Sequence, residues 1–219
     1  MDAGYAFFMD ASQPPQQQRS RETLTALITT TITVLGAGGL EGCTLPRIAA
    51  EANLAAASVY RRFPDKDALL RAAFLHVLQQ NAKIARPQLE KLLLRKSLEA
   101  TVEAIVADLL RQYRQHPRLM RSLSLFLESH SGTTFALEAH RLISARLELT
   151  AALLLEHRDR IRHPNPSRAV VFAMLLATSA VESALLTPDS LWSVALPFAD
   201  KQLAAEISRA ALAYLRRKP

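Results

Sequence analysis

Cysteine, glycine and aromatic residues are scarce in this chain. The single cysteine, Cys43, excludes an internal disulfide framework and any metal site built from several cysteines. Six glycines among 219 residues, four of them between Gly36 and Gly42, leave the rest of the chain free to be helical. Because Ala, Leu, Arg and Glu dominate and β-branched runs are short, the composition predicts an all-α fold.

Motifs for catalysis and metal binding are also missing. The chain has no glycine-rich phosphate loop between a strand and a helix, and no nucleophile elbow. None of the six histidines pairs with another on one helical face beside a carboxylate, which is the spacing that metal sites use. We therefore predict no catalytic residue, no metal, no cofactor and no enzymatic activity.

The first 18 residues contain neither a basic start nor a long apolar core, so they do not resemble a secretory signal. A cytoplasmic protein is predicted. Pro14 and Pro15 precede three glutamines, which is typical of a disordered N-terminal tail over residues 1–18. Folding of this tail along the first helix, or DNA contact through Arg19 and Arg21, remains an alternative.

Acidic residues are few relative to basic ones, and the formal net charge of +7 favours a polyanionic partner. The excess is not concentrated at one end, because residues 1–86 hold nine Lys and Arg against seven Asp and Glu. An argument for nucleic-acid binding must therefore depend on local pattern and not on total charge.

Residues 44–66 have the pattern of two short helices joined by a tight turn, with a third helix following. Thr44 is a suitable N-cap, and a proline two residues later costs no hydrogen bond in the first turn. Asn53 stands where the chain reverses and accepts a left-handed backbone. Val59 and Phe63, four residues apart, give the second helix an inward face.

The outward face of this second helix is small at its start and basic at its end, and no acidic residue lies between Ala52 and Pro64. Such a helix suits insertion into a DNA groove, where small residues approach base edges while polar ones donate to phosphates. The outward residues are Ala56, Ala57, Ser58, Tyr60, Arg61 and Arg62. Periodicity alone is equally compatible with an ordinary helical hairpin that has a solvated basic face.

The order of residues from Leu24 to Leu70 resembles the DNA-binding domain of the TetR family of bacterial transcriptional regulators. The shared landmarks are Leu35, Gly39, Thr44, Ile48, Ala49, Leu54, Tyr60, Phe63, Pro64, Lys66 and Leu69. Three positions depart from the family pattern: Asn53 replaces the usual turn glycine, Ala55 replaces the usual Ser or Thr cap, and Pro46 falls where relatives often carry a polar contact. The missing cap is worth about 1 kcal/mol.

This resemblance implies a sequence-specific DNA-binding regulator that acts on a double-stranded operator. The residues expected to contact DNA are Thr44, Arg47, Ala56, Ala57, Ser58, Tyr60, Arg61, Arg62 and Lys66. Lys66, together with the backbone amides that begin the fourth helix, would clamp a phosphate. The alternative for Lys66 is a surface lysine without a DNA contact. Cys43 has two possible roles, a small buried hydrophobe or a redox sensor.

Breakers divide the remainder of the chain. We assign residues 19–65 to a helix-turn-helix DNA-binding domain of three helices, 66–86 to a connecting helix that Pro87 interrupts, and 87–219 to a helical ligand-binding and dimerisation domain. Amphipathic helices are expected from Leu98 and from Pro117, and a long one from about Phe135 to Ile161.

The last two helices predict a homodimer. Small or apolar residues recur at helical spacing, which lets another helix approach closely, and family resemblance adds a four-helix interface between two chains. These residues are Ala173, Ala177, Ala180 and Ala184, followed by Leu203, Ile207, Ala210 and Tyr214. Packing of both stripes within one chain is the alternative. A membrane span is not predicted, because Glu182 interrupts an apolar run judged too short.

Large apolar residues of the second domain predict a pocket for a small apolar or aromatic effector, with a plain core as the alternative. They are Tyr113, Met120, Phe126, Phe135, Phe172, Met174 and Trp192. The resemblance implies a repressor that this effector releases from its operator. A helical interaction module, or an activator without a small-molecule inducer, is the competing hypothesis.

Overall fold

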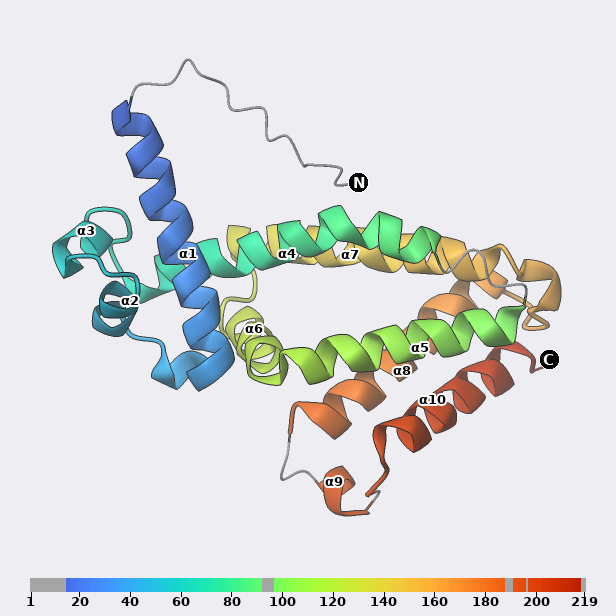
Figure 1. Ribbon diagram of the computed structural model, residues 1–219. Helices are drawn as coiled ribbons and strands as arrows, with labels where there is room; N and C mark the ends of the chain where they lie inside the picture. Colours follow the sequence, from blue (N-terminus) through green and yellow to red (C-terminus); the bar gives the residue numbers. More distant parts are fainter. Residues whose placement is uncertain (1–14, 92–96, 188–190, 196, 218–219) are drawn as a thin grey trace, which may run out of the picture.

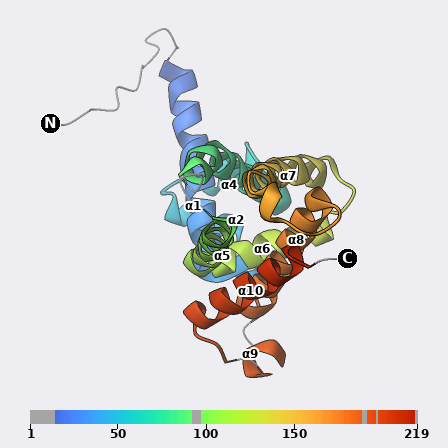
Figure 2. The same ribbon diagram turned by 90° about the vertical axis from the view of Figure 1, so that its right-hand side faces the viewer.

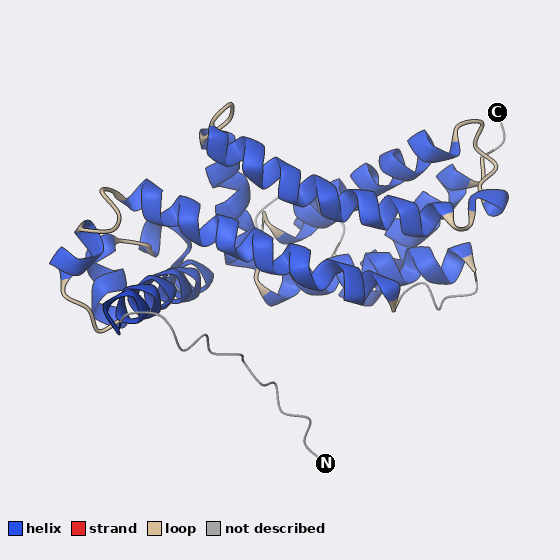
Figure 3. Cartoon of the chain, turned by 90° about the horizontal axis from the view of Figure 1, so that it is seen from above, coloured by secondary structure: helices blue, strands red, loops and turns tan. Residues whose placement is uncertain are grey.

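Helices form the whole of the regular structure in the computed structural model, which describes residues 15–91, 97–187, 191–195 and 197–217. No strand occurs in these ranges (Figure 3), so the predicted all-α class is confirmed. The α-helices are α1 (Pro15–Gly42), α2 (Leu45–Glu51), α3 (Ala56–Tyr60), α4 (Lys66–Glu90), α5 (Leu98–Gln115), α6 (Pro117–Ser129), α7 (Thr134–Leu155), α8 (Pro166–Leu185), α9 (Leu191–Ala195) and α10 (Asp200–Leu215).

Helix α1 begins earlier than the sequence pattern indicated. It starts at Pro15 instead of Ser20, so residues 15–18, which we had assigned to the tail, are helical, while residues 1–14 lie outside the described part. Proline favours the first helical position, where its missing N–H costs nothing. The N-terminal end of α1 extends beyond the other helices (Figure 1), and Leu24, expected on the inner face, is exposed.

Helix α4 continues through the proline that we expected to end it. Pro87 lies inside the helix, which runs to Glu90, so the boundary at residue 86 is wrong for this element. A proline removes one backbone hydrogen bond, and this loss is smaller near a helix end, where few turns depend on it. Residues 92–96 follow outside the described part.

Helix α7 is shorter than expected. It ends at Leu155 instead of Ile161, and a single 3₁₀ turn, Arg158–Arg160, follows it. The predicted starts of α5 at Leu98 and of α6 at Pro117 are confirmed.

The first hydrophobic core joins α1, α2, α3 and α4 to α6 and α7. Leu27, Leu35 and Phe74 are fully buried, and Phe126 of α6 and Phe135 of α7 belong to the same cluster. The ring of Phe126 lies 5.2 Å from that of Phe74 and 5.3 Å from that of Phe135, measured between centroids. These aromatic contacts attach the N-terminal helices, residues 15–65, directly to α6 and α7.

The second core fills the rest of the molecule, between α5, α8 and α10. Leu98, Val106, Val170 and Leu215 are almost completely buried in it. Helix α4 lies alongside α7 in two perpendicular views (Figures 1 and 2), and α10 lies against α5 and α8. Helices α2 and α3 lie at one end of the molecule and the last described residues at the other (Figure 1).

Among the residues that the structure describes, two helices are long and apolar enough to cross a bilayer: Gln17–Gly42 of α1, and α8. Our expectation that α8 is too short was therefore wrong. Glu182 nevertheless places a carboxylate within the apolar sequence of α8, and this carboxylate accepts a hydrogen bond of 2.7 Å from the Tyr113 hydroxyl. The side of α8 that carries Ala173 and Val181 packs into the second core, so that side is already occupied within the chain.

Candidate nucleic-acid interface

The turn between α2 and α3 forms as its sequence predicts. The Thr44 hydroxyl accepts a hydrogen bond of 3.4 Å from the amide of Arg47, which makes it the N-cap of α2. Asn53 has a φ of 54°, the left-handed conformation expected at this turn. The amide of Leu54 donates to the carbonyl of Ala49 at 2.9 Å and closes the turn.

The inner faces of α2 and α3 hold this unit on the first core. Ile48 and Val59 are fully buried, and Phe63 nearly so. Ala55 has the extended backbone of an N-cap but gives α3 no side-chain hydrogen bond. A five-residue helix without a cap is too short to be stable alone, so tertiary packing holds α3 in place.

The exposed side of α3 carries the residues that we predicted for DNA contact. Ala56, Ala57, Tyr60 and Arg61 are exposed, and the Tyr60 side chain keeps 52% of its surface open to solvent. The half-buried Ser58 accepts a 3.0 Å hydrogen bond from the Arg61 guanidinium. The face thus presents phenol and guanidinium donors beside two methyl groups, with no carboxylate among them.

Arg62 connects α3 to the first turns of α1. Its Nη1 atom donates to the hydroxyl of Ser20 at 3.1 Å, across 42 residues of sequence. Sequence reasoning missed this role of Ser20, because nothing in a linear pattern pairs residues so far apart. The contact places the start of α1, with Arg19 and Arg21, beside the end of α3.

Arg47 and Thr44 have partners of their own. The Arg47 Nε lies 2.7 Å from a Glu51 carboxylate oxygen, and its Nη1 donates to the Gly42 carbonyl at 3.2 Å. This guanidinium also lies close to two glycines. A Cβ added at Gly38 would lie 3.3 Å from Nη1, and one added at Gly42 would lie 3.2 Å from it. Both predicted DNA contacts therefore also have structural tasks at the α1–α2 junction.

Lys66 is similarly engaged. Its Nζ donates a 2.7 Å hydrogen bond to the carbonyl of Leu40, near the C-terminal end of α1. An ammonium group has three donors, so two remain available for an anion. Lys66 is thus more than a plain surface lysine, because it ties α1 to the start of α4.

The Cys43 thiol is completely buried at the junction of α1 and α2. Burial raises its pKa above the ordinary value, although the Lys66 ammonium and the Arg47 guanidinium act in the opposite direction. A buried protonated thiol is a weak nucleophile, which favours the small-hydrophobe interpretation over a redox sensor.

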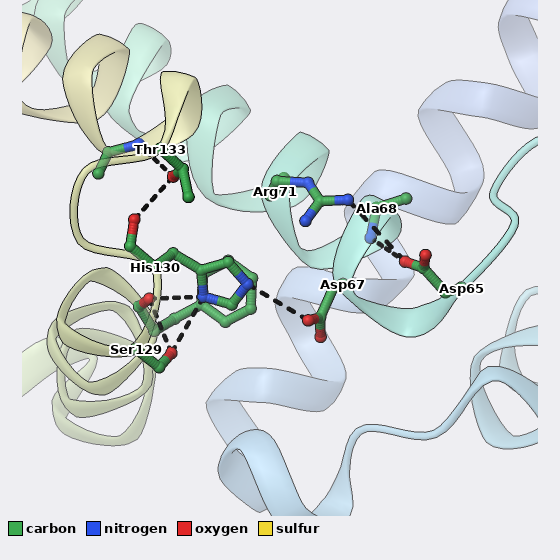
Figure 4. A network of polar contacts seen from close by, with 9 residues as sticks. Asp65, Asp67, Ala68, Arg71, Ser129, His130 and Thr133 are labelled. Carbon is green, nitrogen blue, oxygen red and sulfur yellow. Dashed lines mark hydrogen bonds and ion pairs between the residues drawn. The ribbon is translucent and has the colours of Figure 1, made fainter.

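A polar network lies where α4 begins (Figure 4). Asp65 accepts a 2.6 Å hydrogen bond from the amide of Ala68 and so caps the helix, while Arg71 lies 3.9 Å from the same carboxylate. His130 reaches Asp67 from the loop that joins α6 to α7. The network brings the second domain into contact with the helix that follows the helix-turn-helix.

The predicted pocket residues do not come together. Phe126 and Phe135 belong to the first core, Met120 and the buried Tyr113 to the second, and Phe172 and Trp192 are exposed. Burial and the neighbouring Glu182 raise the pKa of Tyr113, so its hydroxyl stays protonated and donates. Of the seven predicted pocket residues, Met174 alone lines the apolar cleft that the structure contains.

This cleft lies between α5, α7, α8 and α10 and holds about 90 Å³ of free space. Its walls are mainly aliphatic, with Val102, Leu109, Leu154 and Ala177 among them. Asp108, Gln112 and Arg146 supply its polar side. The sequence offered no signal for this cleft, because its walls come from four helices whose packing the linear pattern does not specify.

The predicted alanine stripe of α8 faces inward. Ala173 and Ala177 are buried in the second core, so this part of the stripe packs within the chain. The other side is apolar and open, with Val171, Phe172, Leu175 and Leu176 all exposed. On α10, Ile207 is buried, Leu203 and Tyr214 are half-buried, and Ala210 is exposed; on α8, Ala180 and Ala184 are half-buried.

Among the described residues, no group of three or more His, Cys, Asp or Glu side chains is arranged to hold a metal ion.

A helix-turn-helix joined to further packed helices is the architecture of a class of DNA-binding transcriptional regulators. Residues 27–73 match the family model described as bacterial regulatory proteins, tetR family. The resemblance noted from the sequence is therefore confirmed: the chain carries the DNA-binding domain of the TetR family on the fold of that family's regulators. No curated protein matches the sequence significantly.

Solved structures extend this likeness over most of the chain. A putative TetR-family regulator from Mesorhizobium loti aligns with 90% of this chain and 96% of its own, at 18% identity and a TM-score of 0.68. A TetR-family regulator from Marinobacter aquaeolei covers 91% and 98%, at 21% identity and 0.60. FadR from Bacillus subtilis, solved in complex with stearoyl-CoA, covers 87% and 97%, at 15% identity and 0.61. At these identities the likeness establishes the fold.

Proposed function

We propose that this protein is a transcriptional repressor that binds a roughly palindromic operator as a homodimer and leaves it when a small molecule occupies the second domain. The observation that carries the proposal is the exposed, acid-free face of α3, supported by a helix-turn-helix that matches the TetR-family model. Two such helices, related by a dimer axis, would enter successive major grooves. A regulator of this kind works in the cytoplasm.

The proposed contacts on DNA divide by chemistry. Tyr60, Arg61 and Lys66 would donate to phosphates, with Ser58, Arg62, Thr44 and Arg47 beside them. Ala56 and Ala57 have no polar side-chain atoms, so they would pack against thymine methyl groups. Direct reading of bases would be modest, and DNA shape would contribute to specificity.

The proposed dimer uses the open apolar side of α8. Val171, Phe172, Leu175 and Leu176 form a contiguous exposed surface, and large apolar patches on soluble proteins mark association sites. Half-buried Tyr214 of α10 extends it, with its ring centroid 5.1 Å from that of Phe172. A partner chain would cover this surface and fix the spacing of the two α3 helices.

The proposed effector site is the cleft between α5, α7, α8 and α10. Its walls include Ala173 and Ala177 of α8, the helix that we assign to the dimer. A ligand that shifts α8 would therefore alter the separation of the two heads, and the half-site spacing of DNA tolerates little change. The Bacillus subtilis FadR, solved in complex with stearoyl-CoA, shows that a related fold binds a ligand with a long apolar acyl chain.

An electrophoretic mobility shift with DNA from upstream of the protein's own gene tests the proposal. The wild type should retard this DNA at low salt, and Tyr60→Ala should weaken retardation of every sequence tried. An exposed tyrosine has no core to support, so circular dichroism of the variant should match the wild type. Absence of any retarded band at low salt would favour the interaction-module hypothesis.

The direction of regulation needs a separate measurement. Deleting the gene should raise transcription from the promoters that the protein binds, as measured by reporter fusions. A fall in transcription after deletion would identify an activator and contradict the repressor assignment, while leaving DNA binding intact.

A further inference from the structure

The polar side of the effector cleft has a specific charge arrangement. Asp108 of α5 is the hub: Arg146 Nη2 of α7 lies 3.1 Å from its Oδ2, and Gln112 Nε2 lies 2.5 Å from the same oxygen. Arg111 pairs with its Oδ1. The Asp108 and Arg146 side chains are only 14% and 24% exposed, so this pair is largely shielded from solvent.

Both oxygens of the Asp108 carboxylate already have hydrogen-bond donors, whereas most N–H groups of the Arg146 guanidinium have no acceptor. Both Asp108 oxygens accept hydrogen bonds, two of the three donors being arginines. A guanidinium has five N–H groups, and the Arg146 side chain uses one of its nitrogens, Nη2, to donate to a single carboxylate oxygen. Two arginines against one aspartate also leave one unit of positive charge. A cationic ligand would meet this excess positive charge, while an anionic ligand would find unoccupied guanidinium donors.

The rest of the cleft favours an apolar body on the ligand. Ile105, Leu109, Met174 and Ala177 form walls on two sides, and Asp108 and Arg146 are the only charged residues that line it. An aliphatic or aromatic tail in this space would gain about 0.8 kcal/mol per buried methylene group.

From this arrangement, and resting on the proposed function of the cleft, we infer that the effector is an apolar carboxylic acid whose carboxylate pairs with Arg146. A guanidinium and a carboxylate form two parallel hydrogen bonds, and such charge-assisted pairs are strong in a shielded site. Asp108 would keep Arg111 and Gln112, so binding leaves no buried carboxylate unpaired.

Isothermal titration calorimetry on the full-length protein tests this inference. The probes are hexanoate, octanoate and decanoate below their micelle concentrations, with the matching alcohols and amines and with octanoyl-CoA. At least one carboxylate should bind, more tightly than its alcohol, amine or thioester counterpart. Equal or tighter binding of the alcohol, the amine or the thioester, or no binding by any carboxylate, would overturn the inference.

Arg146→Gln should weaken binding of the carboxylate by about tenfold or more while hardly changing binding of the alcohol. Arg141→Gln is the matched control, because Arg141 lies on the same helix, is exposed and pairs with Glu138 away from the cleft. Both variants remove one positive charge, so a general effect of net charge would change them equally. An unchanged affinity in Arg146→Gln, or equal losses in both, would refute the assignment.

Folding and DNA binding are monitored separately. Arg146→Lys keeps the positive charge but not the paired donors, so it should bind the carboxylate more weakly than the wild type and more tightly than Arg146→Gln. If Arg146→Gln does not fold, Arg146→Lys replaces it as the test variant. DNA retardation without ligand should be the same in wild type and Arg146→Gln. If DNA binding is intact and no carboxylate binds, this inference fails alone; if DNA binding is absent, the proposed function fails.

Discussion

His130 reaches from the loop between α6 and α7 to Asp67 in the first turn of α4, with its Nε2 3.2 Å from the carboxylate (Figure 4). The imidazole also stacks on Phe126, with 3.9 Å between ring centroids, and its Nδ1 lies 2.9 Å from the Phe126 carbonyl. A single side chain thus links the helix that leaves the DNA-binding head to the packed core of the second domain.

The two partners of this contact should differ in their effect on stability. His130→Ala should lower the free energy of unfolding by about 2 kcal/mol, because it removes an aromatic contact and a hydrogen bond. Asp67→Asn should cost less than about 1 kcal/mol, since Asp67 is half exposed. Urea denaturation measures both, with the exposed His140→Ala as control. A larger loss of unfolding free energy for Asp67→Asn than for His130→Ala would contradict this expectation.

Lys66 should contribute one phosphate contact to the complex. Lys66→Ala should lower the slope of log affinity against log salt by about one unit and weaken binding to all sequences. Lys83→Ala removes the same charge from an exposed position on the same helix and should leave the slope unchanged. Equal slopes for the wild type and Lys66→Ala would contradict a phosphate contact and leave Lys66 with a structural role alone, its hydrogen bond to the Leu40 carbonyl.

The left-handed backbone at Asn53 should discriminate between two small replacements. Asn53→Ala should destabilise the fold by about 1 kcal/mol, because alanine lacks the short polar side chain that lets asparagine tolerate this left-handed backbone. Asn53→Gly should remain within about 0.5 kcal/mol of the wild type, since glycine adopts this conformation freely. Thermal and urea unfolding of both variants provide the comparison, and similar losses would argue against backbone strain.

The exposed side of α8 should determine the oligomeric state. Leu175, with 57% of its surface open, lies near the middle of that face, and Leu175→Glu should shift the protein to a monomer in sedimentation velocity. Leu137→Glu places the same charge at an exposed leucine on α7 and should leave the state unchanged. A dimer that survives Leu175→Glu would move the interface elsewhere.

Local rules predicted the helix-turn-helix well. The Thr44 cap, the left-handed Asn53 and the buried Val59 and Phe63 each depend on residues within a few positions of one another. Short-range hydrogen bonding and helical periodicity determine such features, so a linear pattern contains them.

The second domain was harder to predict, because its features depend on which helices meet. The stripe that contains Ala173 and Ala177 has the spacing of an interface, yet packing places it inside the chain and leaves Leu175 outside. A small-residue stripe lets a helix approach closely but does not say which helix approaches. The pairing of Asp108 with Arg146, 38 residues apart, was likewise invisible in the sequence.

The first hydrophobic core has a mechanical consequence. Phe126 and Phe135 complete the cluster around Phe74, so the segment that would grip DNA has no interior entirely of its own. A fragment cut after residue 86 would leave those aromatic contacts bare to water and lose its support. The molecule should therefore unfold in one cooperative step. If the proposed function holds, a change at the C-terminal helices would reach the operator through this shared core and not through a flexible hinge.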